Sequence, residues 1–165
     1  MLWNDFLQDG LLAAIAAIGF SAISNPPRNA YACCALLAAV GPSLRFLLMN
    51  ADCLAVHIIP ASMAASFAIG CLAVRLSSYA KMPAETCLFP SLLPMIPGIY
   101  AYKAFGGLAL CLLHPGQEAF NRYFYLFAYN GLTCLFILLG MVVGATIPIF
   151  LFKNISFRAT RPSQK

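Results

Sequence analysis

The chain has 165 residues, of which 62% are hydrophobic and only 9% are charged. A soluble globular domain carries about 25% charged residues, so this composition excludes one and indicates an integral membrane protein. No hydrophilic stretch is long enough for a second, catalytic domain. The net charge of +5 arises at the ends of apolar segments and in the tail, so it concerns membrane topology and not nucleic-acid binding.

Three apolar segments fill the first half of the chain. The first is predicted to span the membrane from about Phe6 to Ser24, and the sequence Asn25-Pro26-Pro27-Arg28-Asn29 ends it. The second is predicted from Ala30 to Met49 and the third from Cys53 to Leu76. A polar connection is expected over Ser77–Glu85.

The fourth segment, Thr86–Leu113, is apolar enough to cross a bilayer but contains three prolines and a glycine in nine residues. Each proline removes a backbone N–H that a continuous helix would use. The ten residues from Thr86 to Met95 would reach about 15 Å, or half of a hydrocarbon core about 30 Å thick. The pattern predicts a helix broken at mid-membrane, where transporters often place substrate sites, and the alternative is a kinked packing helix.

A short connection is expected over His114–Arg122, followed by a fifth span from Tyr123 to about Phe152. Residues 1–152 are therefore predicted to form one five-span, all-α transmembrane domain. Lys153–Lys165 is predicted to be a basic, disordered cytoplasmic tail. The positive-inside rule places the N-terminus outside and the C-terminus inside, because seven basic residues of the connections, span ends and tail then lie inside and one lies outside.

Ionisable residues within the predicted spans are candidates for function, because their burial is costly. Arg45 lies near the outer end of the second span, where its side chain either extends to the headgroups or turns inward. His57 is similarly shallow, and a packing histidine with a hydrogen bond is the favoured interpretation. Lys103 is deeper. No Asp or Glu occupies the centre of a span, so an anionic ligand or another subunit is expected to supply the partner of a buried cation.

Other polar and small residues have two interpretations each. Asn130 and Thr133, close together on the fifth span, are suited either to substrate binding or to helix association. Gly140 and Gly144 form a G-x-x-x-G pattern, which indicates helix packing. The seven cysteines show no Cys/His spacing typical of zinc, and the spans contain no carboxylate pair or Ser/His pair, so neither a metal, nor a cofactor, nor an enzyme is expected.

The sequence resembles the bacterial threonine/serine exporter (ThrE) family over nearly the whole chain. The most specific part is Pro94-Met95-Ile96-Pro97-Gly98-Ile99-Tyr100-Ala101-Tyr102, which fits P-x-x-P-G-x-x-A-Y. Weaker matches are scattered through the other spans, at Gly19-Phe20, Asn25, Pro27, Cys34-Ala35-Leu36-Leu37, Gly41, Arg45, Asn130, Thr133, Gly144 and Pro148.

The resemblance is greatest to the small five-span (YjjB-like) subunit of the split form of this family. It implies export of threonine, serine or a dicarboxylate such as succinate, in the bacterial cytoplasmic membrane, together with a larger five-span (YjjP-like) partner. Fused relatives with two five-span halves would form an inverted repeat. Lys103 and His57 do not match the family pattern, and Arg28 follows Pro27 directly where the family has a spacer. The alternative is a membrane scaffold or assembly protein that does not transport.

The break suggests how a carboxylate would be bound. If the second half-helix begins at Gly98, its N–H groups and positive dipole end face the midplane, and a residue without Cβ lets the backbone take strained angles and a ligand approach. The candidate substrate-binding residues are Arg45, Pro94, Pro97, Gly98, Tyr102, Lys103, Asn130 and Thr133.

Overall fold

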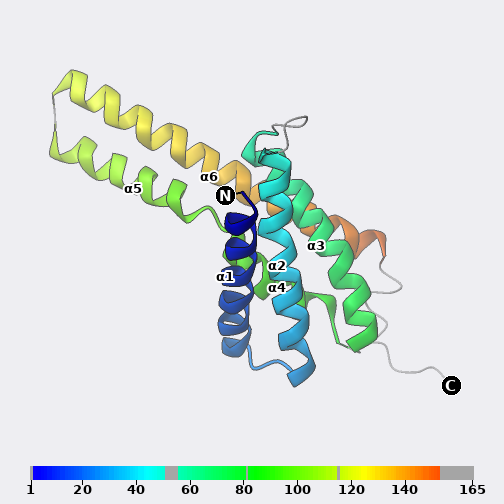
Figure 1. Cartoon of the computed structure of the whole chain (residues 1–165). Coiled ribbons are helices and arrows are strands. Elements are labelled where there is room, and N and C mark those ends of the chain that lie inside the picture. Colours follow the sequence, from blue (N-terminus) through cyan, green and yellow to red (C-terminus); the bar gives the residue numbers. More distant parts are fainter. Residues whose placement is uncertain (1, 51–55, 81, 115, 153–165) are drawn as a thin grey trace. The chain divides into compact units, whose positions relative to one another are not determined.

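The structure, a computed structural model, describes residues 2–50, 56–80, 82–114 and 116–152, with only the backbone for residues 2–7 and 78–80. Over this part of the chain the protein is all-helical and has no strand (Figure 1). Its elements are α1 (Leu2–Ile23), α2 (Arg28–Asn50), α3 (Ile58–Ala80), α4 (Ala84–Leu92), the 3₁₀ turn η1 (Leu93–Met95), α5 (Gly98–Leu113) and α6 (Gln117–Leu151). The predicted tail at 153–165 lies outside the described residues.

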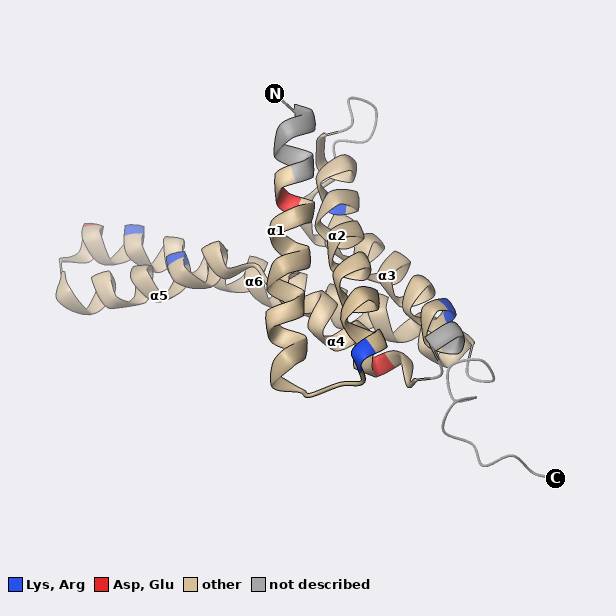
Figure 2. Cartoon of the chain, turned by 60° about the horizontal axis from the view of Figure 1, so that its bottom comes forward, with Lys and Arg blue, Asp and Glu red and all other residues tan. Residues whose placement is uncertain are grey.

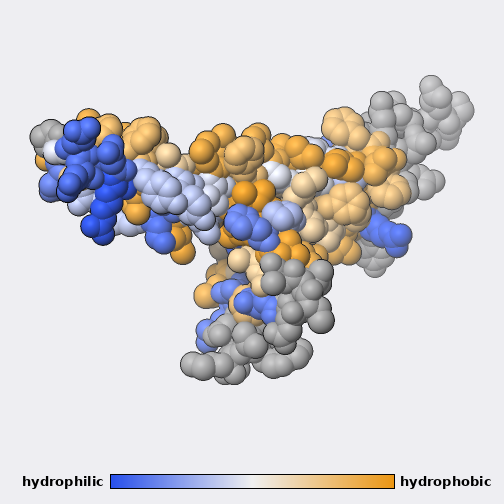
Figure 3. Space-filling model, turned by 90° about the horizontal axis from the view of Figure 1, so that it is seen from above, coloured by the Kyte–Doolittle hydropathy of each residue, from blue (hydrophilic) through white to orange (hydrophobic). Residues whose placement is uncertain are grey.

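The helices have the length and apolar composition of membrane segments. In the described chain α2, α3 and α6 are each long and apolar enough to cross a bilayer. The segment of α4 and η1 is long and apolar enough only when it is taken together with α5. Within α1, Gln8–Ile23 is a shorter apolar helix. Hydrophobic residues cover much of the surface seen in Figure 3, and charged residues are few along the helices in Figure 2. These properties are those of a membrane protein.

The first two predicted spans correspond closely to α1 and α2. The end of α1 has a local cause, because Asn25 adopts a positive φ of 46° and its N–H bonds to the carbonyl of Ala22 at 3.2 Å. Asparagine tolerates this left-handed conformation, and a residue in it ends a helix. Pro42 lies inside α2 without ending it.

The third predicted span, Cys53–Leu76, corresponds to α3, but the helix has other ends, and residues 53–55 lie outside the described part of the chain. α3 begins at Ile58, so His57 lies before the helix and is exposed, and its Nδ1 accepts the N–H of Ile59 at 3.4 Å. His57 is therefore a residue at a helix start and not a packing histidine within a span. At the other end the helix continues to Ala80, because Ser77 is buried and its hydroxyl donates to the carbonyl of Val74 at 2.8 Å. A serine that bonds within its own helix does not act as a polar connection.

Of the three prolines in the fourth segment, Pro90 does not interrupt the helix. It lies within α4, and its missing N–H leaves the carbonyl of Thr86 without a helical partner. The thiol of Cys34 on α2 contacts that carbonyl at 3.8 Å, within reach of a weak sulfur hydrogen bond. The α-helical path stops only after Leu92, and it resumes at Gly98.

The connection predicted over His114–Arg122 is mostly helical. α6 begins at Gln117, and the N–H of Phe120 bonds to the carbonyl of Gly116 at 2.8 Å. With 35 residues α6 is about 52 Å long, whereas a hydrocarbon core is about 30 Å thick. The polar residues at the start of α6 suggested a connection, but a helix that extends beyond the bilayer can also have a polar end.

The chain divides into two compact units: residues up to Met95 together with those from Gly140 onward, and Ile96–Leu139. In the first unit α1 and α2 are antiparallel, since the connection at 24–27 is short and a Cβ on Gly10 would meet Ser43. α2 and α4 run in the same direction, because Cys34 contacts Thr86 and, further along both helices, Arg45 contacts Met95.

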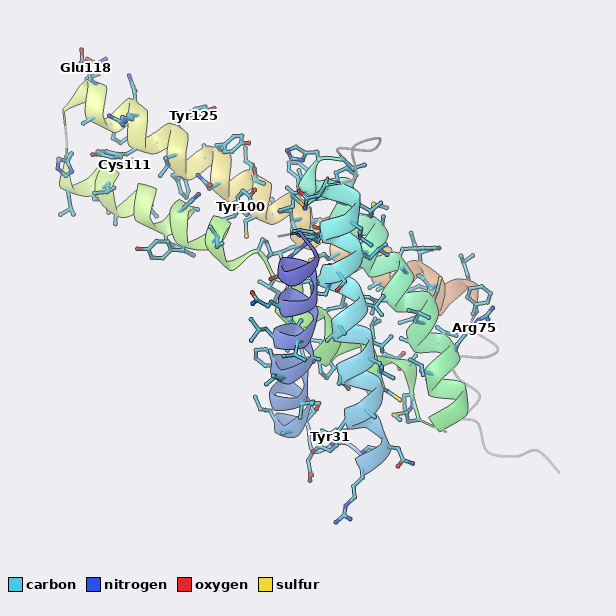
Figure 4. The ribbon with its side chains drawn as sticks, viewed as in Figure 1. Tyr31, Arg75, Tyr100, Cys111, Glu118 and Tyr125 are labelled. Atoms are coloured by element: carbon cyan, nitrogen blue, oxygen red, sulfur yellow. The ribbon has the colours of Figure 1, made fainter. Side chains whose placement is uncertain are left out.

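The second unit is a helical hairpin of α5 and the first part of α6. Gly107 allows the two helices to approach closely, because a Cβ there would lie 2.9 Å from the backbone nitrogen of Phe127. Nearer the turn, the buried thiol of Cys111 faces the carbonyl of Phe120 at 3.8 Å, and Figure 4 shows Cys111 on α5 between the two helices. Hydrophilic residues gather at the end of this hairpin in Figure 3. Glu118, labelled in Figure 4, lies at this end.

Within the first unit, glycines on α3 and α6 bring these helices together. A Cβ on Gly144 would collide with the carbonyl oxygen of Met63, and one on Gly70 would lie 2.7 Å from the carbonyl oxygen of Ala145. Gly140, the other residue of the G-x-x-x-G pattern, faces Met63 as well. The packing role predicted for the pattern is thus confirmed, and the order of these contacts makes α3 and this part of α6 parallel.

This packing predicts that Gly144→Ala destabilises the first unit. Alanine normally favours a helix over glycine, but here its Cβ would force α6 away from the Met63 carbonyl, at a cost of about 1–3 kcal/mol. The matched control is Gly106→Ala on α5, where a Cβ meets nothing within 4 Å. Thermal unfolding of the two variants in detergent should show a lower midpoint for Gly144→Ala alone. Equal midpoints would contradict the close contact.

Candidate functional site

The interruption after η1 has a defined hydrogen-bonding pattern. Pro97 has φ −78° and ψ 67°, and the N–H of Gly98 bonds to the carbonyl of Ile96 at 2.8 Å. These values describe an inverse γ-turn centred on Pro97, whose ring fixes φ in the required range. α5 then begins, with the N–H groups of Tyr100 and Ala101 both bonded to the Pro97 carbonyl.

Met95, the last residue of η1, is held from two sides. Its side chain is completely buried, and it occupies the space that a Cβ on Gly41 would need, since that Cβ would lie 2.6 Å from the Met95 sulfur and against Ile69. Its carbonyl accepts a hydrogen bond from Nη1 of Arg45 at 2.9 Å. A cation at the carbonyl end of a helical segment is favourable, and this one satisfies a carbonyl at the point where the helix stops.

Of the two positions open to the Arg45 side chain, the structure has the inward one. The guanidinium bonds to the carbonyl at the break, and the residue is half-buried. Arg45 and Pro94 also line a cavity of about 350 Å³, within the range of about 300–1,000 Å³ usual for small-ligand pockets. The other lining residues are Asp9, Leu12, Ala13, Ala16 and Pro42.

Asp9 is the functional candidate that the sequence pattern missed. It lies near the start of the first predicted span and not at the centre, and a buried cation was expected to find its anionic partner in a ligand or another subunit. The structure corrects this, because Asp9 on α1 lines the same cavity as Arg45 on α2. A signal was present in the sequence: the short connection between the first two spans makes them antiparallel, and Asp9 and Arg45 are almost equally far from it.

Gly98 does not use the conformational freedom that was predicted for it. Its φ is not positive, and a Cβ there would meet nothing within 4 Å, so neither the backbone nor the packing requires glycine. The start of α5 is also less available to an anion than expected, since the N–H groups of Gly98 and Tyr100 are already bonded to carbonyls. Pro97, in contrast, is buried and shapes the γ-turn.

The remaining candidates belong to the second unit. Tyr102 is 79% exposed, and Lys103 is exposed beside it on α5. Asn130 and Thr133 are buried on α6, and each donates to a carbonyl of its own helix at 2.7 Å, from the Asn130 amide to Leu126 and from the Thr133 hydroxyl to Tyr129. The Thr133 hydroxyl proton and one of the two Asn130 amide protons are therefore engaged within α6, and the side-chain oxygens remain as acceptors.

A second cavity, of about 230 Å³, lies within the hairpin. It is lined by small, aliphatic and aromatic residues from both helices and by one cysteine, and no charged group is among them: Ala101, Ala104, Phe105, Phe127, Gly131, Cys134, Leu135 and Leu138. An ionised carboxylate would lose its hydration there without a partner, so this cavity does not suit it. Of the predicted site residues, the structure brings together Arg45 and Pro94 around the cavity of the first unit.

The chain was compared with known proteins. A family model described as "Threonine/Serine exporter, ThrE" matches residues 9–151. A curated protein of uncharacterised function from Haemophilus influenzae is 34% identical over 146 residues, which are 88% of this chain and 47% of that protein. The chain thus spans about half the length of this relative. No solved structure matches significantly.

The family match covers the helices of both units and includes the Arg45 cavity, the proline and glycine break and the α5–α6 hairpin. The chain belongs to the threonine/serine exporter (ThrE) family of membrane transport proteins.

Proposed function

We propose that this protein is a subunit of a secondary exporter that moves small carboxylate-bearing metabolites across a bacterial cytoplasmic membrane. The cavity between α1, α2 and η1 is the substrate site, with Arg45 as the carboxylate-binding residue. The observation that carries the proposal is the pairing of Arg45 with the interrupted helix in a chain of the exporter family. Irregular backbone at membrane depth is favourable only where it is buried in protein or lines a cavity.

The charges around the cavity favour a hydroxy amino acid over a dicarboxylate. Arg45 is suited to an α-carboxylate, since a guanidinium presents donors in a planar fork that matches it. Asp9, on the same cavity, is suited to an α-ammonium group. A second carboxylate, as in succinate, would instead face the like charge of Asp9. Threonine and serine therefore fit the cavity better than succinate does.

We also propose that the chain acts with a larger five-span (YjjP-like) partner. It spans about half the length of its curated relative, which supports a relation between this chain and one half of a two-part transporter. The contacts of α3 with the end of α6 make these two helices parallel. The chain between them must therefore return to the side of the membrane where α3 begins, which supports five spans. Two such halves of opposite orientation would form the two bundles that alternating access requires.

The site predicts distinct effects of its two charged residues on transport by the partnered complex in proteoliposomes. Arg45→Gln should raise the KM for threonine at least about tenfold, since a hydrogen bond to a charged group contributes about 1.5–3 kcal/mol. Lys103→Gln, on the exposed surface of α5, should have a smaller effect. Asp9→Asn should lower the preference for threonine over succinate. A wild-type complex that prefers succinate, with a preference insensitive to Asp9→Asn, would contradict the proposed substrate.

A second prediction concerns the two glycines near the break. Gly98→Ala should insert and fold like the wild type, because the added Cβ meets nothing. Gly41→Ala should displace Met95 from its pocket and reduce export strongly. Export rates normalised to the amount of folded protein, measured by size-exclusion chromatography, compare the two. Normal export by Gly41→Ala would mean that the position of Met95 is unimportant.

The third prediction is topological. A cysteine label in the tail should react from the cytoplasmic side, and one at 50–52 should react from outside. Labelling of both positions from the same side would exclude five spans.

The protein without its partner should give no net export, because a single half lacks an opposing bundle.

A further inference from the structure

One side chain, that of Arg45, connects the cavity to the break. Arg45 lines the cavity with Asp9 and Pro94, and its Nη1 donates to the carbonyl of Met95 at 2.9 Å. In a continuous helix that carbonyl would accept the N–H of Ile99, but α5 begins only at Gly98. The bond from Arg45 therefore replaces the helical bond that the break removes.

Of the three residues that follow Met95, Pro97 is buried, but its two neighbours are exposed. Met95 is fixed by the pocket beside Gly41 and Ile69, whereas Ile96 is 45% exposed and Gly98 has no neighbour where its Cβ would be. The turn is closed by one three-residue hydrogen bond, from Gly98 to Ile96. A short turn next to an anchored residue can change conformation without repacking a core, so residues 96–98 are the natural hinge of this segment.

A ligand carboxylate in the cavity would compete with the Met95 carbonyl for the same guanidinium. A charge-assisted bond to a carboxylate is roughly twice as strong as one to a neutral group, so the exchange favours the ligand. We propose that Arg45 is a ligand-operated latch: it holds the Met95 carbonyl when the cavity is empty, and it releases the carbonyl and frees the turn at 96–98 when a carboxylate binds.

The latch rests on the proposed function, since it needs a carboxylate-bearing substrate in this cavity. Export requires that the substrate bind two conformations with different affinity, because a ligand shifts a conformational equilibrium only as far as its affinity differs between the two states. The latch supplies such a difference. With the latch, the difference is the exchange of one partner of Arg45 for another. The substrate thereby loosens the backbone next to its own site.

Hydrogen–deuterium exchange of the partnered complex in nanodiscs, with L-threonine as the probe, tests the latch. In the wild type, saturating threonine should speed exchange in a peptide that covers 95–100 at least about threefold, because the Gly98 and Tyr100 N–H groups then open more often. In Arg45→Gln the same peptide should exchange fast with or without threonine. A peptide from 30–40 of α2 serves as the internal control.

The matched control variant is Arg75→Gln, which removes an exposed arginine of α3 away from the cavity (Figure 4) and should leave the threonine response intact. If threonine is exported but exchange at 95–100 is unchanged or slower, Arg45 binds both partners at once and the latch is wrong, while the proposed function stands. If threonine is neither bound nor exported, the function and the latch are both wrong. The wild-type comparison decides even if Arg45→Gln does not fold.

Discussion

The hydrogen bond between Arg45 and the Met95 carbonyl is the contact on which the arrangement of the first unit depends most. Prolines at 94 and 97 end the α-helical path and leave carbonyls that apolar surroundings would penalise. The guanidinium satisfies the last of them, and it comes from a helix far away in sequence. Because an arginine in a membrane segment is costly without such partners, the break and the charge stabilise each other.

Small residues allow close contacts at several places in the first unit. Gly41 leaves room for the methionine side chain between α2 and α3, and Gly70 and Gly144 let α3 and α6 approach within the same unit. Association of helices in a membrane relies on such close contacts, since lipid offers no hydrophobic driving force between them. Gly41 thus makes room for the end of η1, and Gly70 and Gly144 join α3 to the end of α6.

The sequence predicted the elements of the fold better than their ends. Apolar length and the turn signals around Asn25 located α1 and α2, but polarity misplaced the start of α6 and the end of α3, where Ser77 bonds within its own helix. Composition alone does not distinguish a polar connection from a helix that extends beyond the bilayer. For the site, residue type identified Arg45 and Pro94. Asp9 was missed because its role depends on the pairing of α1 with α2.

A structure of the partnered complex with threonine bound, at a resolution that distinguishes the carboxylate from the side chain, tests the central claim most directly. We expect the carboxylate on Arg45 and the ammonium group near Asp9, with the Met95 carbonyl released from the guanidinium. Threonine bound at the start of α5 or in the cavity of the hairpin, with the bond between Arg45 and Met95 intact, would contradict it.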